Sequence, residues 1–264
     1  MSDYKSAFAP YLENLVQLKR NLGYKYRTGA SRLLQIDKFA VLQDVVEPVV
    51  TKCFAHEWCK QRPNETNSNR YLRAQALYQL SNYLTGIGKT SYKPIMTKWS
   101  STFVPYIFTH DEIKAVFAAC DQLRARNANK QSSINIIPAL FRLLYGTGMR
   151  ISEALSLFNK DVHLDEKYIV IRISKNGRER MLPLSDSVTE VCKTYAKYRD
   201  RQPIKNGPDD FFFRSLNGNE VNYGAADTWF RQILRIAGIP YLGRGIGPRV
   251  HDLRYPNKNI ILTF

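Results

Sequence analysis

The sequence predicts an α+β protein that is mainly α-helical, and three observations lead to this. Apolar residues recur at three- and four-residue intervals through most of the chain, which is the spacing of amphipathic helices. The pair Asn176-Gly177 stands between two apolar, β-branched runs, which predicts one β-hairpin. The chain has 264 residues, 44% of them hydrophobic, which is enough for two domains that each bury a core.

Four helices are expected in a first domain, residues 1–88. Phe8, Leu12 and Leu15 begin a helical repeat, and Gly23 follows it as a C-terminal cap. Similar repeats follow, so a small four-helix bundle is predicted. Its helices are expected over residues 4–22, 31–42, 49–60 and 69–84.

Residues 89–105 are expected to form an interdomain linker, because the stretch that begins at Gly86 is polar and the chain after it has no helical period. A second domain, residues 106–264, then starts with a helix. Thr109 and Glu112 have the spacing of a capping box ahead of an apolar repeat.

The second domain is organised around the string Gly-Thr-Gly-Met-Arg-Ile-Ser-Glu at residues 146–153. An apolar helix leads into it, and Gly146 and Gly148 are expected to end that helix because glycine tolerates positive φ. A second helix is expected to fix Arg150 in its first turn, beside backbone amides that attract anions. The pattern predicts a phosphate site at Arg150; the simpler interpretation is a surface salt bridge.

The predicted hairpin has strands over residues 168–173 and 180–184. Counting by twos from Ile169 and Ile171 puts Lys175 on the inward-facing side near the hairpin tip. The simpler interpretation of Lys175 is a solvated hairpin lysine. Helices over 187–199 and 225–237 follow, joined by a buried segment at 211–213.

The string His251-Asp-Leu-Arg254 follows Arg150 by about a hundred residues and puts His251 and Arg254 on one helical face. With Arg150, this combination resembles the tyrosine recombinase (phage integrase) family. The signature of that family pairs an Arg in a Thr-Gly-x-Arg-x-Ser-Glu string with a downstream His-x-x-Arg.

The resemblance implies a four-helix core-binding domain that clamps DNA and a catalytic domain in which a tyrosine attacks the scissile phosphate. No metal or nucleotide cofactor is then required. Arg150 and Arg254 match the arginines that clamp the non-bridging oxygens. His251 would assist proton transfer or hold a phosphate oxygen, and Lys175 would protonate the departing 5′-oxygen.

The resemblance ends soon after the His-x-x-Arg string, at Arg254. Family members continue through a second His or Trp, the nucleophilic Tyr and a helix exchanged between protomers. We therefore expect a C-terminally truncated member that lacks the nucleophile. Tyr255 adjoins Arg254, which makes in-line attack on a phosphate held by that arginine awkward, and Pro256 disfavours helical geometry at Tyr255.

The net charge of +16 is divided evenly between residues 1–100 and 101–264, so both parts are expected to face a polyanion. Double-stranded DNA is the expected partner, together with full-length family protomers in a synaptic tetramer. Tyr24, Tyr26 and Tyr71 interleave with the basic residues of the first domain; each basic residue taken alone suits a solvated surface. The expected DNA contacts are Lys19, Arg20, Lys25, Arg27, Arg32, Arg70, Arg73, Arg178 and Arg180.

Other classes of function find little support in the sequence. No long apolar run, lipidation motif or secretory signal is visible, which favours a cytoplasmic protein without a membrane anchor. Cys53, His56 and Cys59 have a spacing that suggests a metal site, but Cys53 and Cys59, six residues apart, lie well apart around a helix and no fourth ligand is near, so no metal site is expected.

The sequence leaves three functions open. The leading hypothesis is a tyrosine-type site-specific recombinase or integrase that is inactive alone because it lacks the nucleophile. The alternative is a catalytically dead DNA-binding regulator or pseudogene product. A third possibility, an enzyme like the type IB topoisomerases, would share the chemistry and relax supercoils without producing recombinants.

Overall fold

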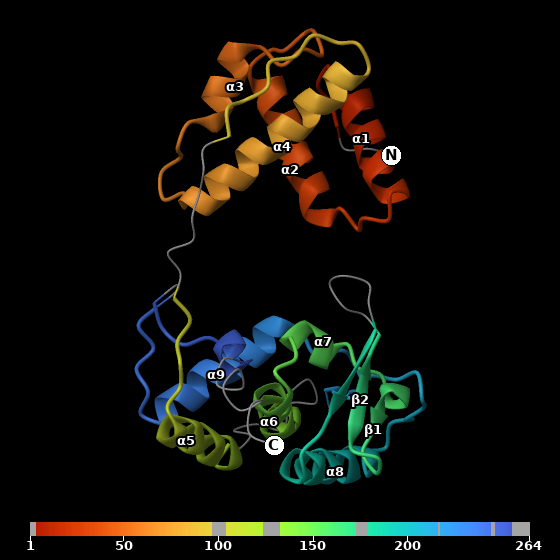
Figure 1. The fold of residues 1–264 in the computed structure, drawn as a ribbon, viewed down its shortest axis with the longest axis vertical. Coiled ribbons are helices and arrows are strands. Elements are labelled where there is room, and N and C mark those ends of the chain that lie inside the picture. The colour runs from red at the N-terminus through yellow and green to blue at the C-terminus, as the bar shows by residue number, and fades with distance from the viewer. Residues whose placement is uncertain are drawn as a thin grey trace. The chain divides into compact units, whose positions relative to one another are not determined.

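The computed structural model describes residues 4–96, 104–123, 133–172, 179–215, 217–243 and 246–254. The chain forms two compact units, Met1–Thr102 and Phe103–Phe264 (Figure 1). Both contain helices, and the second also contains a small antiparallel sheet. The predicted α+β, mainly helical fold class is thus confirmed.

The first unit is a bundle of four helices around one apolar core, as predicted. Its largest buried side chains include Phe8, Leu12, Leu33, Trp58 and Leu77. Two helices start one residue after a threonine whose hydroxyl accepts from a backbone amide of the first turn, an N-cap that fixes the start of the helix. The helices are α1 (Ala9–Asn21), α2 (Arg27–Leu42), α3 (Lys52–Cys59) and α4 (Asn67–Gly86).

α1 begins at Ala9, later than the predicted start at residue 4, because a buried carboxylate holds the residues before Ala9 in a non-helical conformation. Asp37 on α2 is 1% exposed and accepts from the backbone N–H groups of Lys5 and Ser6 and from the Ser6 hydroxyl. Pro10 near the helix start has no N–H to donate, which suits the first turn.

Arg73 contradicts the prediction of an exposed DNA-binding arginine on α4. It is 1% exposed, and its Nε and Nη2 donate to the two carboxylate oxygens of Glu65 at 2.9 and 2.8 Å. Nη2 also donates to the backbone carbonyl of Lys60, and the guanidinium lies over the Trp58 ring. A buried guanidinium with these partners is a structural element of the bundle and cannot reach a DNA phosphate.

The second unit packs its helices around α6 (Ile137–Thr147), whose apolar face is fully buried. α5 (His110–Asp121), α8 (Asp186–Asp200) and the short η3 (Val250–Arg254) contact it. The predicted capping box at the start of α5 is confirmed, since Thr109 and Glu112 exchange hydrogen bonds between side chain and backbone. The remaining helical segments are η1 (Ile134–Ile136), α7 (Ile151–Leu155), η2 (Asn159–Asp161) and α9 (Tyr223–Ile236).

A three-stranded antiparallel sheet lies next to α7 and α8 (Figure 1). The predicted hairpin forms its β2 (Tyr168–Ile171) and β3 (Arg180–Pro183), with Ile171 opposite Arg180. A two-residue strand that was not predicted, β1 (Val162–His163), pairs with β2. Ile169 and Ile171 are buried, as the inward count requires, while Lys175 at the tip lies outside the described residues.

Candidate active site

The turn that carries Arg150 joins α6 to α7, and its two glycines have different tasks. Gly148 has φ of 62° and caps α6, as predicted for a glycine that ends a helix. Gly146, by contrast, lies within α6, and a Cβ there would stand 2.6 Å from a methyl group of Val188 on α8. The expectation that Gly146 helps to end the helix through a positive φ was wrong: glycine is needed there for close packing between two helices.

Arg150 is the N-cap residue of α7 instead of a first-turn residue, and α7 has only five residues. Its backbone N–H donates to the carboxylate of Glu153 at 2.8 Å, so this amide is not open to an anion. The part of the predicted anion site that used this amide is therefore wrong. The Arg150 side chain is 37% exposed and is open to an anion.

Glu153 forms an ion pair with the Arg150 side chain. Its carboxylate is 3% exposed and accepts from Arg150 Nη1 at 2.8 Å and from Arg180 Nη2 on β3 at 2.6 Å. Burial alone raises the pKa of Glu153, but the hydrogen bonds from Arg180 and Arg150 outweigh it and lower the pKa. Glu153 is thus a buried, ionised carboxylate shared by two arginines.

The predicted His-x-x-Arg string forms η3 and reaches the same turn. Arg254 Nε donates to the backbone carbonyl of Gly148, and Arg254 Nη1 lies 3.3 Å from His251 Nε2. Asp252 between them is buried and accepts from the backbone N–H and the guanidinium of Arg249, which fixes the segment. Arg254 is therefore held beside the backbone that presents Arg150.

The surroundings of His251 favour its neutral form. Its pKa is lowered below the usual value by burial first, and then by the positive charges of Arg254, Arg249 and Arg150. A guanidinium has no acceptor, so a hydrogen bond from Arg254 requires an unprotonated Nε2, with the imidazole proton on Nδ1. The ring nitrogen that faces Arg254 is thus the one able to take up a proton.

The structure thus brings together three of the predicted catalytic residues, Arg150, His251 and Arg254, from two distant segments. Lys175, Arg178 and Tyr255 lie outside the described residues. Sequence reasoning missed the role of Glu153, although a glutamate three residues into a helix is a known signal for a bond back to its start. The predicted DNA contacts on the first unit that the structure leaves on its surface, fully or in part, are Lys19, Arg20, Lys25, Arg27, Arg32 and Arg70.

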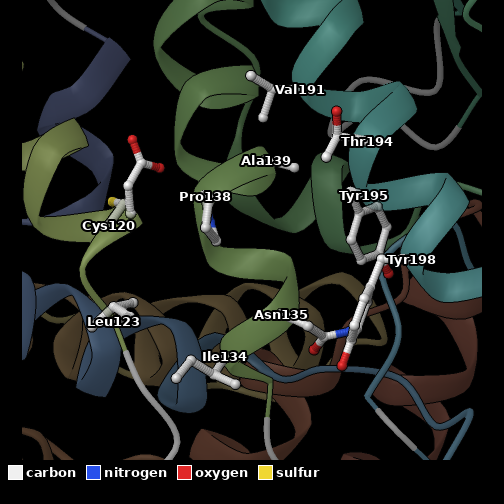
Figure 2. Close-up of a pocket in the computed structure, with 11 residues that line it drawn as sticks. Cys120, Leu123, Ile134, Asn135, Pro138, Ala139, Val191, Thr194, Tyr195 and Tyr198 are labelled. Carbon is white, nitrogen blue, oxygen red and sulfur yellow. The ribbon is translucent and has the colours of Figure 1, made fainter.

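The active-site candidate is distinct from the cavity drawn in Figure 2. That cavity has a volume of about 460 Å³ and lies between the end of α5, the start of α6 and α8. Its lining is mostly apolar and includes Leu123, Pro138, Val191 and Tyr195, but none of the three predicted catalytic residues. The described parts of the chain also contain no cluster of His, Cys, Asp or Glu suited to a metal ion, and no helix long and apolar enough to cross a membrane.

Known proteins resemble both the sequence and the fold. A putative integrase/recombinase of Sinorhizobium fredii is 27% identical over 97% of this chain and 80% of its own length. Tyrosine recombinase XerD of Listeria monocytogenes is 28% identical over 70% of this chain and 59% of its own.

Two solved structures share the fold at low sequence identity. The XerH site-specific recombinase bound to its difH substrate has a TM-score of 0.67 at 21% identity, covering 95% of this chain and 73% of that one. The Tn1549 transposon integrase, in complex with transposon right end DNA, has a TM-score of 0.68 at 16% identity, covering 96% and 87%. The phage integrase family model matches residues 107–256, which contain the whole site described above. The chain therefore belongs to the phage integrase family, the tyrosine-type site-specific recombinases and integrases.

Proposed function

We propose that this protein binds double-stranded DNA in the cytoplasm and that Arg150, His251 and Arg254 hold the phosphate at which active members of the family cut and rejoin a strand. The observation that carries the proposal is the bond from Arg254 to the carbonyl of Gly148, which joins the two signature strings at one turn. Family membership supports the class of reaction, site-specific recombination through a phosphotyrosyl intermediate.

The chemistry follows from the charges at this site. A phosphodiester gains negative charge on its non-bridging oxygens when a fifth oxygen approaches, and guanidinium groups stabilise that charge through paired N–H donors. A neutral His251 can accept the proton of an attacking hydroxyl at Nε2 once Arg254 turns to the phosphate. Lys175 remains our proposed general acid for the departing 5′-oxygen.

The first unit supplies affinity without sequence selection in this proposal. Residues 1–88 would form the DNA-clamping domain, 89–105 the linker and 106–264 the catalytic domain. Contacts to the DNA backbone come from the exposed basic residues of the bundle, without the buried Arg73. Further protomers of the family would complete a synaptic tetramer, as in the λ integrase tetramer bound to a Holliday junction.

The nucleophile is the part of the proposal that depends most on experiment. For the 264-residue chain we keep the expectation that it binds DNA without cutting it, either as an inactive family member or as a DNA-binding regulator. Tyr255 is the first candidate to test against that expectation, and it lies outside the described residues.

A single experiment separates these outcomes. The chain and its Arg150→Lys and Arg254→Lys variants are incubated with a pool of nicked suicide duplexes that carry a randomised core. Binding is followed between about 50 and 200 mM salt, and adducts are sought on denaturing gels. We expect steeply salt-dependent binding that changes little in the two variants, and no adduct.

Each other outcome removes a defined part of the proposal. A covalent band would overturn the expectation of no cleavage, and mass spectrometry of the attached peptide would then name the nucleophile. In that case both lysine variants must impair cleavage much more than binding, and equal losses would remove the two arginines from the active site. Absence of DNA binding at low salt would overturn the proposal as a whole.

A further inference from the structure

Glu153 divides its carboxylate between two arginines from different elements. Oε1 receives Arg150 Nη1 at 2.8 Å, and Oε2 receives Arg180 Nη2 at 2.6 Å, with Arg180 Nη1 at 3.3 Å from Oε1. Oε2 also accepts from the backbone N–H of Arg150 at 2.8 Å, so the Arg150 guanidinium itself contacts the carboxylate through one nitrogen only. Its Nε and Nη2 donate no hydrogen bond to any residue in the described part of the chain.

The same molecule shows the alternative geometry. Arg73 faces Glu65 with two nitrogens, Nε and Nη2, one for each carboxylate oxygen. Such a two-point pair is the stronger arrangement for an isolated arginine and carboxylate. Without Arg180, Oε2 of Glu153 would accept only the backbone N–H of Arg150, and the Arg150 guanidinium could reach this oxygen with a second N–H group. That N–H group would then bind the protein and would not be available to a phosphate.

We propose that Arg180 is a positioning residue that occupies the second oxygen of Glu153 and so keeps Arg150 in one-point contact, with its remaining donors available to a phosphate. The inference rests on the proposed function, since it assigns a phosphate to Arg150. It replaces the DNA contact that we predicted for Arg180 from the sequence.

Charge supports the same assignment. Two guanidinium groups and one ionised carboxylate leave this trio with a net charge of +1, partly exposed through Arg150 and Arg180. Without Arg180, the pair of Arg150 and Glu153 is neutral overall, and its attraction for a phosphate falls accordingly. His251 can report a phosphate at Arg150, because the charge of Arg150 is one of the causes that lower the pKa of His251.

Arg172 provides a matched control on the same hairpin. It follows directly after Ile171, which pairs with Arg180 across the two strands. Its Nε donates to Asp161, whose side chain is 4% exposed, so Arg172 also ties the hairpin to a buried carboxylate. Arg172 does not touch Glu153. If the arginine only anchors the hairpin, Arg180→Leu and Arg172→Leu will have the same effect. If Arg180 positions Arg150, only Arg180→Leu will weaken phosphate binding.

The test uses inorganic phosphate as the probe and the ring resonances of His251 in NMR spectra as the readout. These resonances are easy to assign because the chain has only four histidines. We expect phosphate to shift His251 in the wild-type chain. Arg180→Leu should weaken this binding about tenfold, within the range for residues of one ion-pair network. Arg180→Lys should recover part of the affinity, and Arg172→Leu should behave as wild type.

A second measurement asks whether Arg180 acts through Glu153. In a Glu153→Gln background the effect of Arg180→Leu should be clearly smaller, because no carboxylate then competes for Arg150 and only the loss of one positive charge remains. An equal loss in both backgrounds would show that Arg180 contacts the phosphate directly, which overturns the inference. So would a salt slope of duplex binding that falls by about one in Arg180→Leu, as removal of a phosphate contact predicts.

The outcomes also separate this inference from the proposed function. If phosphate does not shift His251 in the wild-type chain, the phosphate site itself is wrong, and the inference fails with it. If phosphate binds to the wild-type chain and Arg180→Leu matches Arg172→Leu, the proposed function stands and only the role of Arg180 is overturned.

Discussion

Two arginine–glutamate pairs, one in each unit, differ in how much of the guanidinium the protein uses. Arg73 in the helical bundle is 1% exposed, and its Nε and Nη2 each donate to one carboxylate oxygen of Glu65. Arg150 in the second unit is 37% exposed and gives one nitrogen to Glu153, which accepts its second arginine from β3. The same pair of residue types is thus structural where the arginine is buried and bonded to the carboxylate through two nitrogens. It is suited to a ligand where the arginine is partly exposed and uses one.

The largest effect that this comparison predicts is the loss of stability in Arg73→Leu. Removing one partner of a buried pair leaves an uncompensated charge, here on Glu65, at a cost of about 3–5 kcal/mol. Urea unfolding of the first unit should show it. The exposed pair of Lys60 and Glu57 is the control, and Glu57→Gln should leave the unfolding midpoint unchanged. Equal midpoints for the two variants would refute the structural role of Arg73.

A smaller loss is expected for Glu153→Gln. Two arginines then face a neutral amide, but each is about one-third exposed and keeps contact with water, so we expect about 1–3 kcal/mol. Urea unfolding of the second unit measures it. A loss as large as that of Arg73→Leu would show that solvent does not reach these arginines, contrary to the comparison.

Arg150→Leu should destabilise the protein less again. Glu153 keeps Arg180 as its partner in this variant, so the cost should stay near that of a surface pair, about 1 kcal/mol or less. The same variant should lose the phosphate response of His251. Thermal unfolding measures the stability loss, and a phosphate titration of the same sample measures the response of His251. A large stability loss with phosphate binding retained would show that Arg150 is a structural residue and not a phosphate ligand.

The smallest expected effect is on acid sensitivity. The hydrogen bond from Arg73 lowers the pKa of Glu65 in the folded protein. A lowered pKa contributes stability above the unfolded value of about 4.3, and this stability is lost as the pH falls below it. Urea midpoints between about pH 6 and pH 3 should therefore fall more steeply in the wild-type chain than in Arg73→Leu. Parallel profiles would contradict the pairing.

Much of the fold was readable from the sequence, because it depends on local signals. The helical repeats, the Thr109 cap and the Asn-Gly turn each act over a few residues, and each predicted its element. The helical repeat also places Arg73 on the buried face of α4, because Arg73 precedes Leu77, Leu80 and Leu84 by helical intervals.

The active site was predictable only in part. Two signature strings identify Arg150, His251 and Arg254, but no local pattern states that Arg254 will bond to the carbonyl of Gly148. The sharing of Glu153 is also out of reach, since it depends on the packing of a hairpin strand against a turn about thirty residues earlier in the chain. Residue types were thus predictable, whereas the division of their hydrogen bonds required the structure.

The position of Trp58 makes the two units separately observable by fluorescence. Trp58 is 1% exposed and the guanidinium groups of Arg62 and Arg73 each lie over its ring, while Trp229 belongs to the second unit. A variant that keeps Trp58 as its single tryptophan will emit at short wavelength as long as the bundle is intact. Its red shift on heating will report the opening of the first unit alone.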